Sequence, residues 1–264
     1  MAAWSLVLIG WALVAVMMTA LWLVQRTTSD AGIVDVGWTA GLGMLAVLYG
    51  VFASGAGPYR ALVATVAGLW SLRLATYVYV DRIRGKPEDG RYQTLRARWG
   101  ERAQRRFLVF FQVQGLLDTI LSLPMLVVAT QQTPSLGGWQ YAGLAVWVVA
   151  VSGEWSADRQ LARFRADPAN KGKTCRVGLW RYSRHPNYFF EWLHWWVYVL
   201  MGVGAGWWWL ATLIGPAVIF FFLFRVTGIP ATEKQALASR GEDYRDYQRT
   251  TSMFVPLPPR RGAR

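Results

Sequence analysis

The sequence predicts an all-α polytopic membrane protein with seven transmembrane helices. Hydrophobic residues make up 54% of the chain, and they gather in stretches long enough to cross a bilayer, which takes about 20 residues. The basic residues lie in the polar segments between these stretches. Because cytoplasmic loops carry such an excess of Lys and Arg, the formal net charge of +13 indicates membrane topology rather than nucleic-acid binding.

The first three helices are expected at 5–24, 33–53 and 60–80. The first apolar stretch is too long for a cleaved signal peptide and lacks a basic start, so we interpret it as a transmembrane helix. The turn-rich segment from Ser54 to Tyr59 separates the second helix from the third.

Charge places the next segments on opposite sides of the membrane. Residues 81–106 are polar and carry nine basic side chains, which predicts a cytoplasmic loop before a fourth helix at 107–129. The following residues 131–138 are uncharged, as expected on the outer side. A fifth helix is expected at 139–157, and the eight basic residues of 158–185 predict a second cytoplasmic loop.

The last two helices are expected at 187–202 and 206–225, because the glycine-rich segment 202–206 breaks this long apolar stretch into a hairpin. We therefore expect residues 1–264 to form a single integral-membrane domain in the bacterial inner membrane. Its N-terminus should lie outside and its C-terminus in the cytoplasm. Membrane lipids are the expected neighbours, and the sequence indicates neither nucleic acid nor an obligate protein partner.

The segment 178–196 runs from a basic turn into an apolar aromatic helix. Pro186 predicts the start of that helix, because proline fixes φ and its missing N–H is no loss in the first turn. The polar side chains that follow at spacings of four, three and four share one helix face. They are Asn187, Glu191, His194 and Tyr198.

Glu191 lies one turn inside this apolar helix, where an unpaired carboxylate is costly and marks a candidate functional site. The alternative is a structural pair at the membrane interface with Arg184 or Arg181. We interpret His194, which lies deeper, as a core histidine.

Other apolar stretches also carry charged or polar residues. Asp35, Arg73, Gln114 and Asp118 lie within the second, third and fourth predicted helices. Such residues should face the interior of the bundle, where Arg73 could neutralise Asp118 or Asp35 in a structural ion pair. Because the second, fourth, fifth and sixth helices each carry an acid, the pattern favours a polar cavity that opens to the cytoplasm.

The basic loops face the same side as that cavity. Arginine suits bidentate capture of phosphate, so a phosphorylated cofactor or an anionic substrate is indicated, although topology and anionic lipid explain many basic residues equally well. Tyr182 and Tyr188 add stacking groups beside these charges. Neither a Rossmann nor a P-loop motif is present, and one Cys with two His residues predicts no metal site.

Residues 178–183 and 184–191, Gly-Leu-Trp-Arg-Tyr-Ser and Arg-His-Pro-Asn-Tyr-Phe-Phe-Glu, resemble the C-terminal region of the steroid 5α-reductase superfamily. The resemblance is greatest to its bacterial branch of unknown function. It extends upstream through Asp158 and Arg165, and downstream from the Gly-Glu-Asp-Tyr-Arg-Asp-Tyr of 241–247 to the Phe-Val-Pro ending at 256. More loosely, it includes 84–92.

The resemblance implies a seven-helix membrane domain whose cytoplasmic loops wrap NADPH, and hydride transfer to an activated C=C bond of a steroid-like or other lipid molecule. It implies that Asp35 is the catalytic acid, polarising or protonating the conjugated carbonyl. Trp38, Arg73, Gln114 and Asp118 are the expected substrate-pocket residues. The expected cofactor contacts, including the polar neighbours of the motif, are Asp158, Arg165, Arg176, Tyr182, Arg184, His185, Asn187, Tyr188, Glu191, Glu233, Tyr244 and Tyr247.

The Arg-His-Pro-x-Tyr turn and the tryptophan-rich hairpin also resemble membrane methyltransferases that act on isoprenylcysteine or phospholipid. Their cofactor is S-adenosylmethionine, and Glu233, Tyr244 and Tyr247 could serve that site as well. A non-enzymatic lipid-binding protein is a third interpretation. Glu191 and the acid at Asp35 favour the reductase, because methyl transfer has no evident need of either.

Overall fold

The computed structural model describes residues 1–226 and 228–260. This part of the chain is helical, and its only β pairing is an isolated bridge between Ser183 and Ser252. The chain divides into two compact units, 1–140 with 201–214, and 141–200 with 215–264.

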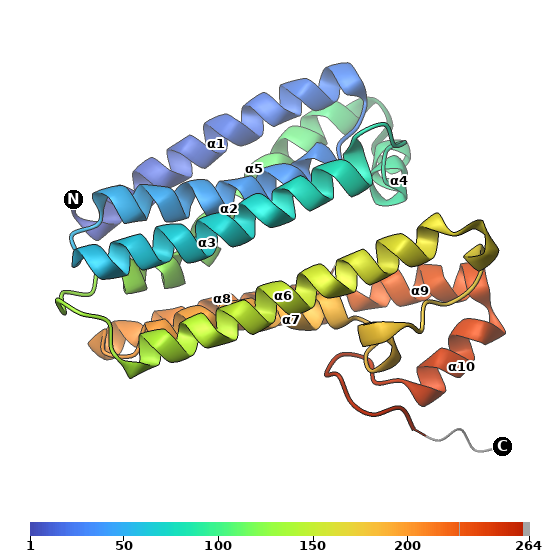
Figure 1. The fold of residues 1–264 in the computed structure, drawn as a ribbon. Helices are drawn as coiled ribbons and strands as arrows, with labels where there is room; N and C mark the ends of the chain where they lie inside the picture. The colour runs from blue at the N-terminus through green and yellow to red at the C-terminus, as the bar shows by residue number, and fades with distance from the viewer. Residues whose placement is uncertain (227, 261–264) are drawn as a thin grey trace. The chain divides into compact units, whose positions relative to one another are not determined.

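Unit 1 is built from long helices that pack side by side (Figure 1). Its α-helices are α1 (Ala3–Thr28), α2 (Ile33–Phe52), α3 (Gly57–Val78), α4 (Gly90–Trp99) and α5 (Ala103–Ala129). A 3₁₀ segment, Gly206–Leu213, completes the unit. The long apolar helices pack closely because small residues face one another, as is usual in membranes. At Gly43 and Gly50 of α2, a Cβ would collide with Ser71 and Ala64 of α3.

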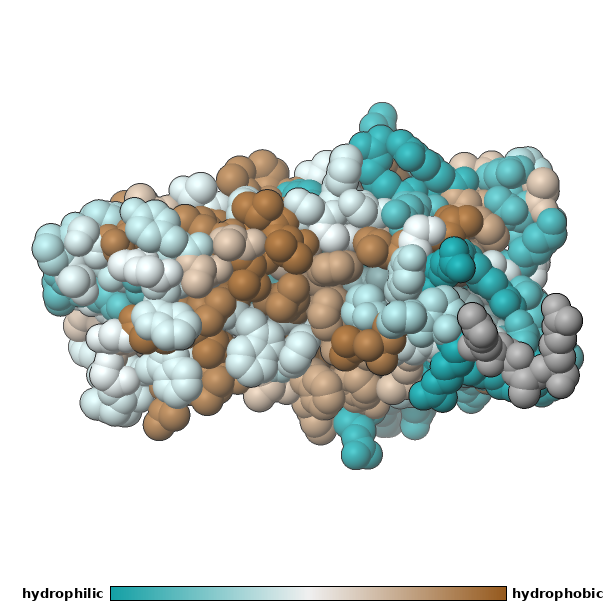
Figure 2. Space-filling view, turned by 60° about the horizontal axis from the view of Figure 1, so that its bottom comes forward, coloured by the Kyte–Doolittle hydropathy of each residue, from teal (hydrophilic) through white to brown (hydrophobic). Residues whose placement is uncertain are grey.

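Unit 2 contains most of α6 (Gly138–Ala166) and α7 (Pro186–Met201), followed by α8 (Ile214–Phe221), α9 (Ile229–Arg240) and α10 (Glu242–Thr250). Its visible face is hydrophobic in the middle, whereas hydrophilic residues gather at the end where α9 and α10 lie (Figure 2). The unit thus joins an apolar helical part to a polar part that carries its short C-terminal helices.

Phe254 anchors the chain after α10 to the apolar part of unit 2. Its ring packs edge-on against Phe189 and Trp192 of α7 and against Phe224, with centroids 5.1 to 5.7 Å apart. Aromatic pairs at this spacing add to the free energy gained from area burial. The chain around Phe254 is thereby held against the turn that precedes α7, where Ser183 Oγ donates a hydrogen bond to Phe254 O (2.7 Å).

Each of the seven predicted apolar segments is helical, and α7 begins at Pro186 as predicted. Within the described residues, five helical ranges are long and apolar enough to cross a membrane, which fits an integral membrane protein. These ranges are Ala3–Thr28, Ile33–Phe52, Gly57–Ile83, Gly90–Ala129 and Gly206–Arg240. The predicted spans at 139–157 and 187–202 lie in α6 and α7, which are outside this set.

Three local predictions are corrected. Residues 158–166 were expected in a loop but continue α6, because Ala, Leu, Gln and Arg favour helix until Asp167-Pro168 stops it. The polar segment 81–106 contains α4, whose first turn is capped by the Asp89 carboxylate accepting from Arg91 N at 2.9 Å. The last predicted span begins as the 3₁₀ segment 206–213 rather than as α-helix.

Candidate functional site

The turn before α7 is held by hydrogen bonds within itself and by hydrogen bonds to α10 and the chain that follows it. His185 N donates to Ser183 Oγ (3.1 Å), and Arg184 N donates to Ser252 O (2.9 Å). The Tyr247 hydroxyl of α10 donates to the carbonyls of Trp180 and of Ser183. The basic turn predicted from sequence is therefore a rigid junction between α7 and the C-terminal helices.

The Glu233 carboxylate of α9 has four hydrogen-bonding partners at this junction. Arg184 Nε lies 2.7 Å and Gln248 Nε2 2.8 Å from its carboxylate oxygens, with His185 Nε2 at 3.3 Å and the Tyr244 hydroxyl at 3.5 Å. Arg184 also donates to the Gln248 and Thr251 carbonyls. Three residues predicted to contact a cofactor, Arg184, His185 and Tyr244, thus bond a fourth, Glu233, within unit 2.

Burial sets the electrostatics of this cluster. It lowers the pKa of His185, because the imidazolium is poorly solvated there, although the Glu233 carboxylate acts in the opposite direction. Burial and then the Glu233 charge raise the pKa of Tyr244 to about 12. At neutral pH the cluster therefore holds an arginine cation and a neutral imidazole and phenol around one carboxyl group.

Arg176, which was also predicted to contact the cofactor, forms ion pairs within the protein. Its guanidinium donates to Asp246 (2.8 Å) and to Asp243 (2.9 Å) of α10. Burial would raise the pKa of Asp243, but hydrogen bonds from Thr174 and the Arg176 charge bring it below its ordinary value. The hydrogen bond from Arg176 likewise lowers the pKa of Asp246. Arg176 therefore fastens the loop before α7 to α10.

The polar face of α7 lies against α6. Asn187 Nδ2 donates to Asp158 Oδ1 across 3.4 Å, so two residues predicted to contact one cofactor are adjacent. Glu191 follows one turn later on the same face, and the Arg184 guanidinium, one of the two partners considered for it, bonds Glu233 and the carbonyls of Gln248 and Thr251.

Farther along the face, His194 Nε2 and the Tyr198 hydroxyl lie 2.9 Å apart, which fits a core histidine. At the start of α7, the Tyr188 ring stacks on His185, while Tyr182 is exposed in the turn before the helix.

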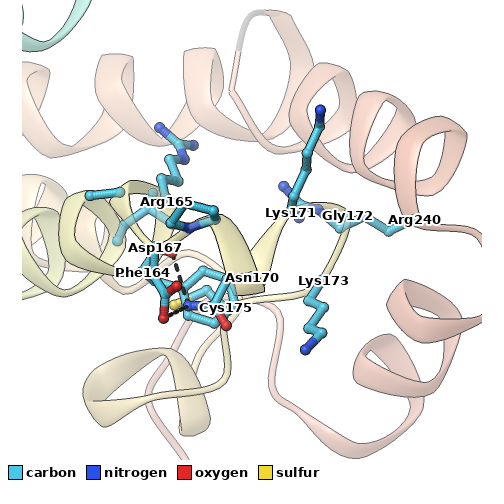
Figure 3. Close-up of a pocket in the computed structure, with 12 residues that line it drawn as sticks. Phe164, Arg165, Asp167, Asn170, Lys171, Gly172, Lys173, Cys175 and Arg240 are labelled. Carbon is cyan, nitrogen blue, oxygen red and sulfur yellow. Dashed lines mark hydrogen bonds between the residues drawn. The ribbon is translucent and has the colours of Figure 1, made fainter.

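Arg165 lines a pocket of about 280 Å³ at the end of α6. The pocket also contains Lys171, Lys173 and the last residue of α9, Arg240, with Phe164 and Leu161 as its apolar wall (Figure 3). It lies just below the range of about 300–1,000 Å³ that is usual for small-molecule sites. Its cations suit phosphate, and its aromatic wall suits a planar ring.

Of these pocket residues, only Arg165 was singled out from the sequence. Lys171 and Lys173 were visible as part of a basic loop, but the pattern did not distinguish them from basic residues that merely set topology. Nothing in the sequence pattern indicated Arg240 or Phe164 as pocket residues, because the end of α9 comes close to the end of α6 only in the folded protein. Cys175 forms part of the wall, and burial raises the pKa of its thiol.

The residues predicted to act on the substrate all lie in unit 1. Asp35 at the start of α2 accepts from Arg91 (2.9 Å) and from the buried hydroxyl of Tyr92 (2.7 Å), with Arg82 3.9 Å away. Both carboxylate oxygens therefore accept hydrogen bonds from residues of α4. Sequence reasoning missed Tyr92, although it lies in the segment 84–92 of the looser resemblance.

Asp118 of α5 is buried, and within the described residues neither of its oxygens has a hydrogen-bond partner. It packs where Gly41 of α2 leaves room, since a Cβ there would lie 2.5 Å from Oδ2. The expected pairing of Asp118 with Arg73 is therefore not a hydrogen-bonded one, and the hydrogen bonds of Asp35 come from Arg91 and Tyr92. Trp38 and Gln114 are half-buried on α2 and α5.

Comparison with known proteins identifies a family for this chain. A family model described as a protein of unknown function, DUF1295, matches residues 21–251. No curated protein and no solved structure matches significantly. Because the family match spans most of the sequence, the chain belongs to the DUF1295 family of proteins of unknown function.

Proposed function

We propose that the chain is a membrane-embedded reductase that uses NADPH to reduce an activated C=C bond in a steroid-like or other lipid molecule. One observation carries this proposal: α6 presents Asp158, bonded to Asn187, and Arg165 in the basic pocket. Seven residues along an α-helix are two turns, about 10 Å on the same face. A buried carboxylate and a cation that would bind a phosphate thus lie about two turns apart on one helix face, which supports an extended cofactor along it.

Sequence resemblance supports the same assignment. The 178–191 motif resembles the steroid 5α-reductase superfamily, with which the DUF1295 family is grouped. Within unit 2, Asn187, Glu191 and Asp158 would hold the nicotinamide end of NADPH, and Arg165 would hold a phosphate. The cluster around Glu233 would support this site from behind by fixing the turn that begins α7.

Bound NADPH supplies the hydride, while the chain positions it and manages the proton. We assign the acid role in unit 1 to Asp35 together with Tyr92. The Tyr92 hydroxyl donates a hydrogen bond to the Asp35 carboxylate (2.7 Å). Because the phenol has one hydrogen, which it donates to Asp35 here, Tyr92 would protonate a substrate carbonyl only by turning that hydrogen from Asp35 to the carbonyl oxygen, with Arg91 remaining the partner of the carboxylate. Trp38, Arg73, Gln114 and Asp118 remain the proposed lining of the substrate pocket.

The methyltransferase alternative is disfavoured by charge. S-adenosylmethionine carries a sulfonium cation and no phosphate, whereas cations dominate the polar lining of the pocket at the end of α6. The phosphate oxygens of NADPH would instead be attracted to the cations of this pocket. We also propose that the chain spans the bacterial inner membrane seven times, with its basic loops and C-terminus in the cytoplasm.

The test is a titration of detergent-purified protein with NADPH and, separately, with S-adenosylmethionine. We expect NADPH to bind and S-adenosylmethionine not to bind. Glu191→Ala should weaken NADPH binding. Asp35→Asn should leave NADPH binding intact, which also shows that the variant is folded, but should abolish NADPH oxidation with an α,β-unsaturated lipid ketone. The assignment is wrong if both variants turn over at the wild-type rate, or if only S-adenosylmethionine binds.

A further inference from the structure

The basic pocket at the end of α6 has an electrostatic imbalance. Arg165, Lys171, Lys173 and Arg240 line it, against one acidic residue, Asp167. Within the described residues none of these four cations forms an ion pair, although the Arg240 guanidinium also lies 5.9 Å from the Tyr244 ring. The pocket lining therefore carries an excess of positive charge, four cations against one carboxylate.

Within the described residues Asp167 forms no ion pair with these cations, and its carboxylate accepts local hydrogen bonds instead. One oxygen accepts from Ala169 N (2.9 Å) and the other from Asn170 Nδ2 (3.4 Å). Asn170 also donates to Phe164 O (3.1 Å), which folds the 3₁₀ turn Pro168–Asn170 back onto α6. The carboxylate therefore shapes the wall of the pocket, and the cations remain available for an anion.

Two of the four cations extend to one side of the pocket. Arg165 and Lys171 extend to the same side, whereas Lys173 points the other way (Figure 3). Gly172 makes this possible with φ of +78°, a conformation that L side chains rarely adopt. Phe164 and Leu161 supply the apolar wall.

We infer that this pocket binds the 2′-phosphorylated adenosine ribose of NADPH, and that Lys171 makes the protein prefer NADPH over NADH. The inference rests on the proposed function. A phosphate monoester carries about −1.5 to −2 charges at neutral pH and offers three acceptor oxygens, which Arg165 and Lys171 satisfy. The hydroxyl at the same position of NADH leaves the lysine without a counter-charge, so only the phosphorylated cofactor gains from it.

The test compares NADPH and NADH binding to detergent-purified protein by calorimetry. The wild type should bind NADPH more tightly than NADH. Lys171→Ala should weaken NADPH binding by about tenfold or more, the effect of losing one hydrogen bond to a charged group, and leave NADH binding unchanged. The matched control is Lys234→Ala, an exposed lysine of α9 outside the pocket, which should change neither affinity. Lys171→Arg should retain the preference.

Competition gives a second readout that is independent of the variants. Adenosine 2′-monophosphate should displace NADPH at lower concentration than adenosine 5′-monophosphate does. The inference is overturned if wild-type protein binds the two cofactors equally, or if Lys171→Ala weakens both by the same factor. Either result leaves the proposed reductase intact, whereas failure of both cofactors to bind overturns the proposed function and this inference together.

Discussion

Arg184 is a buried cation whose hydrogen bonds all end within unit 2. It donates to the Glu233 carboxylate and to the carbonyls of Gln248 and Thr251, so it joins the start of α7 to α9 and to the C-terminal end of α10. A planar guanidinium makes several bonds in fixed directions, which an ammonium group does not reproduce. Its identity as arginine therefore matters for stability.

We predict that Arg184→Lys destabilises the protein by about 1–3 kcal/mol, because buried acceptors lose their donors. The control is Arg181→Lys, an exposed residue three positions earlier that forms no ion pair within the described residues. Thermal unfolding in detergent measures both variants. Equal shifts for the two would show that the bonds of Arg184 contribute nothing specific.

His185 makes stability depend on pH. Because burial lowers its pKa in the folded state, the unfolded chain binds more protons between that lowered pKa and the ordinary value of about 6.5. Its contribution is therefore complete above about 6.5 and is lost as the pH falls towards the lowered pKa, by at most about 1.4 kcal/mol per pH unit.

The measurement is the thermal midpoint at about one pH unit above and one below 6.5. The midpoint should fall on acidification in the wild type and fall less in His185→Gln, which cannot take up the proton. An identical pH dependence in the two proteins would assign the effect to other groups.

At the scale of elements, the contact between α6 and α7 depends on a missing side chain. Gly153 of α6 faces the ring of Phe190 on α7, and a Cβ at position 153 would overlap that ring. This close approach brings the polar face of α7, with Asn187, against Asp158 of α6.

We predict that Gly153→Val destabilises the protein by about 1–3 kcal/mol, the usual effect of overpacking, and weakens NADPH binding by separating Asn187 from Asp158. Adding Phe190→Ala should restore part of both, because the smaller side chain makes room. Thermal unfolding and NADPH titration of the single and double variants form a double-mutant cycle. Strictly additive losses would contradict direct contact as the cause.

At the scale of the whole molecule, the predicted residues separate by unit. All the proposed cofactor contacts lie in unit 2, and the proposed acid and substrate-pocket residues lie in unit 1. This separation fits a chain in which one part binds the cofactor and another binds the lipid. It also makes the two roles separable by mutation, as the Asp35 and Glu191 variants require.

The seven-span topology makes a prediction about α6, which is not among the five apolar ranges. In a Cys175→Ser background, Ser135→Cys should react with a membrane-impermeant maleimide on intact cells, because 131–138 is expected outside. Lys173→Cys should react only after the membrane is opened. Labelling of both on intact cells, or of neither, would show that α6 does not cross the membrane.

The positions of the long apolar helices were predictable because hydropathy and length are local properties of the chain. The start of α7 followed from Pro186 alone, and the extra turns of α6 were missed because charge was interpreted as loop. For charged residues in an α-helix that continues beyond an apolar stretch, charge density does not distinguish helix from loop.

The sequence by itself determined the all-α membrane class, the basic loops and the motif at 178–191. Only the tertiary structure decided which polar atoms are already bonded and which are available. In the sequence, Arg184, Arg176 and Arg165 all belong to one basic segment. In the structure, the first two pair with acids on α9 and α10, whereas Arg165 lines a pocket. The reason is physical: a side chain's charge is encoded locally, whereas its partner is set by packing between segments far apart in the chain.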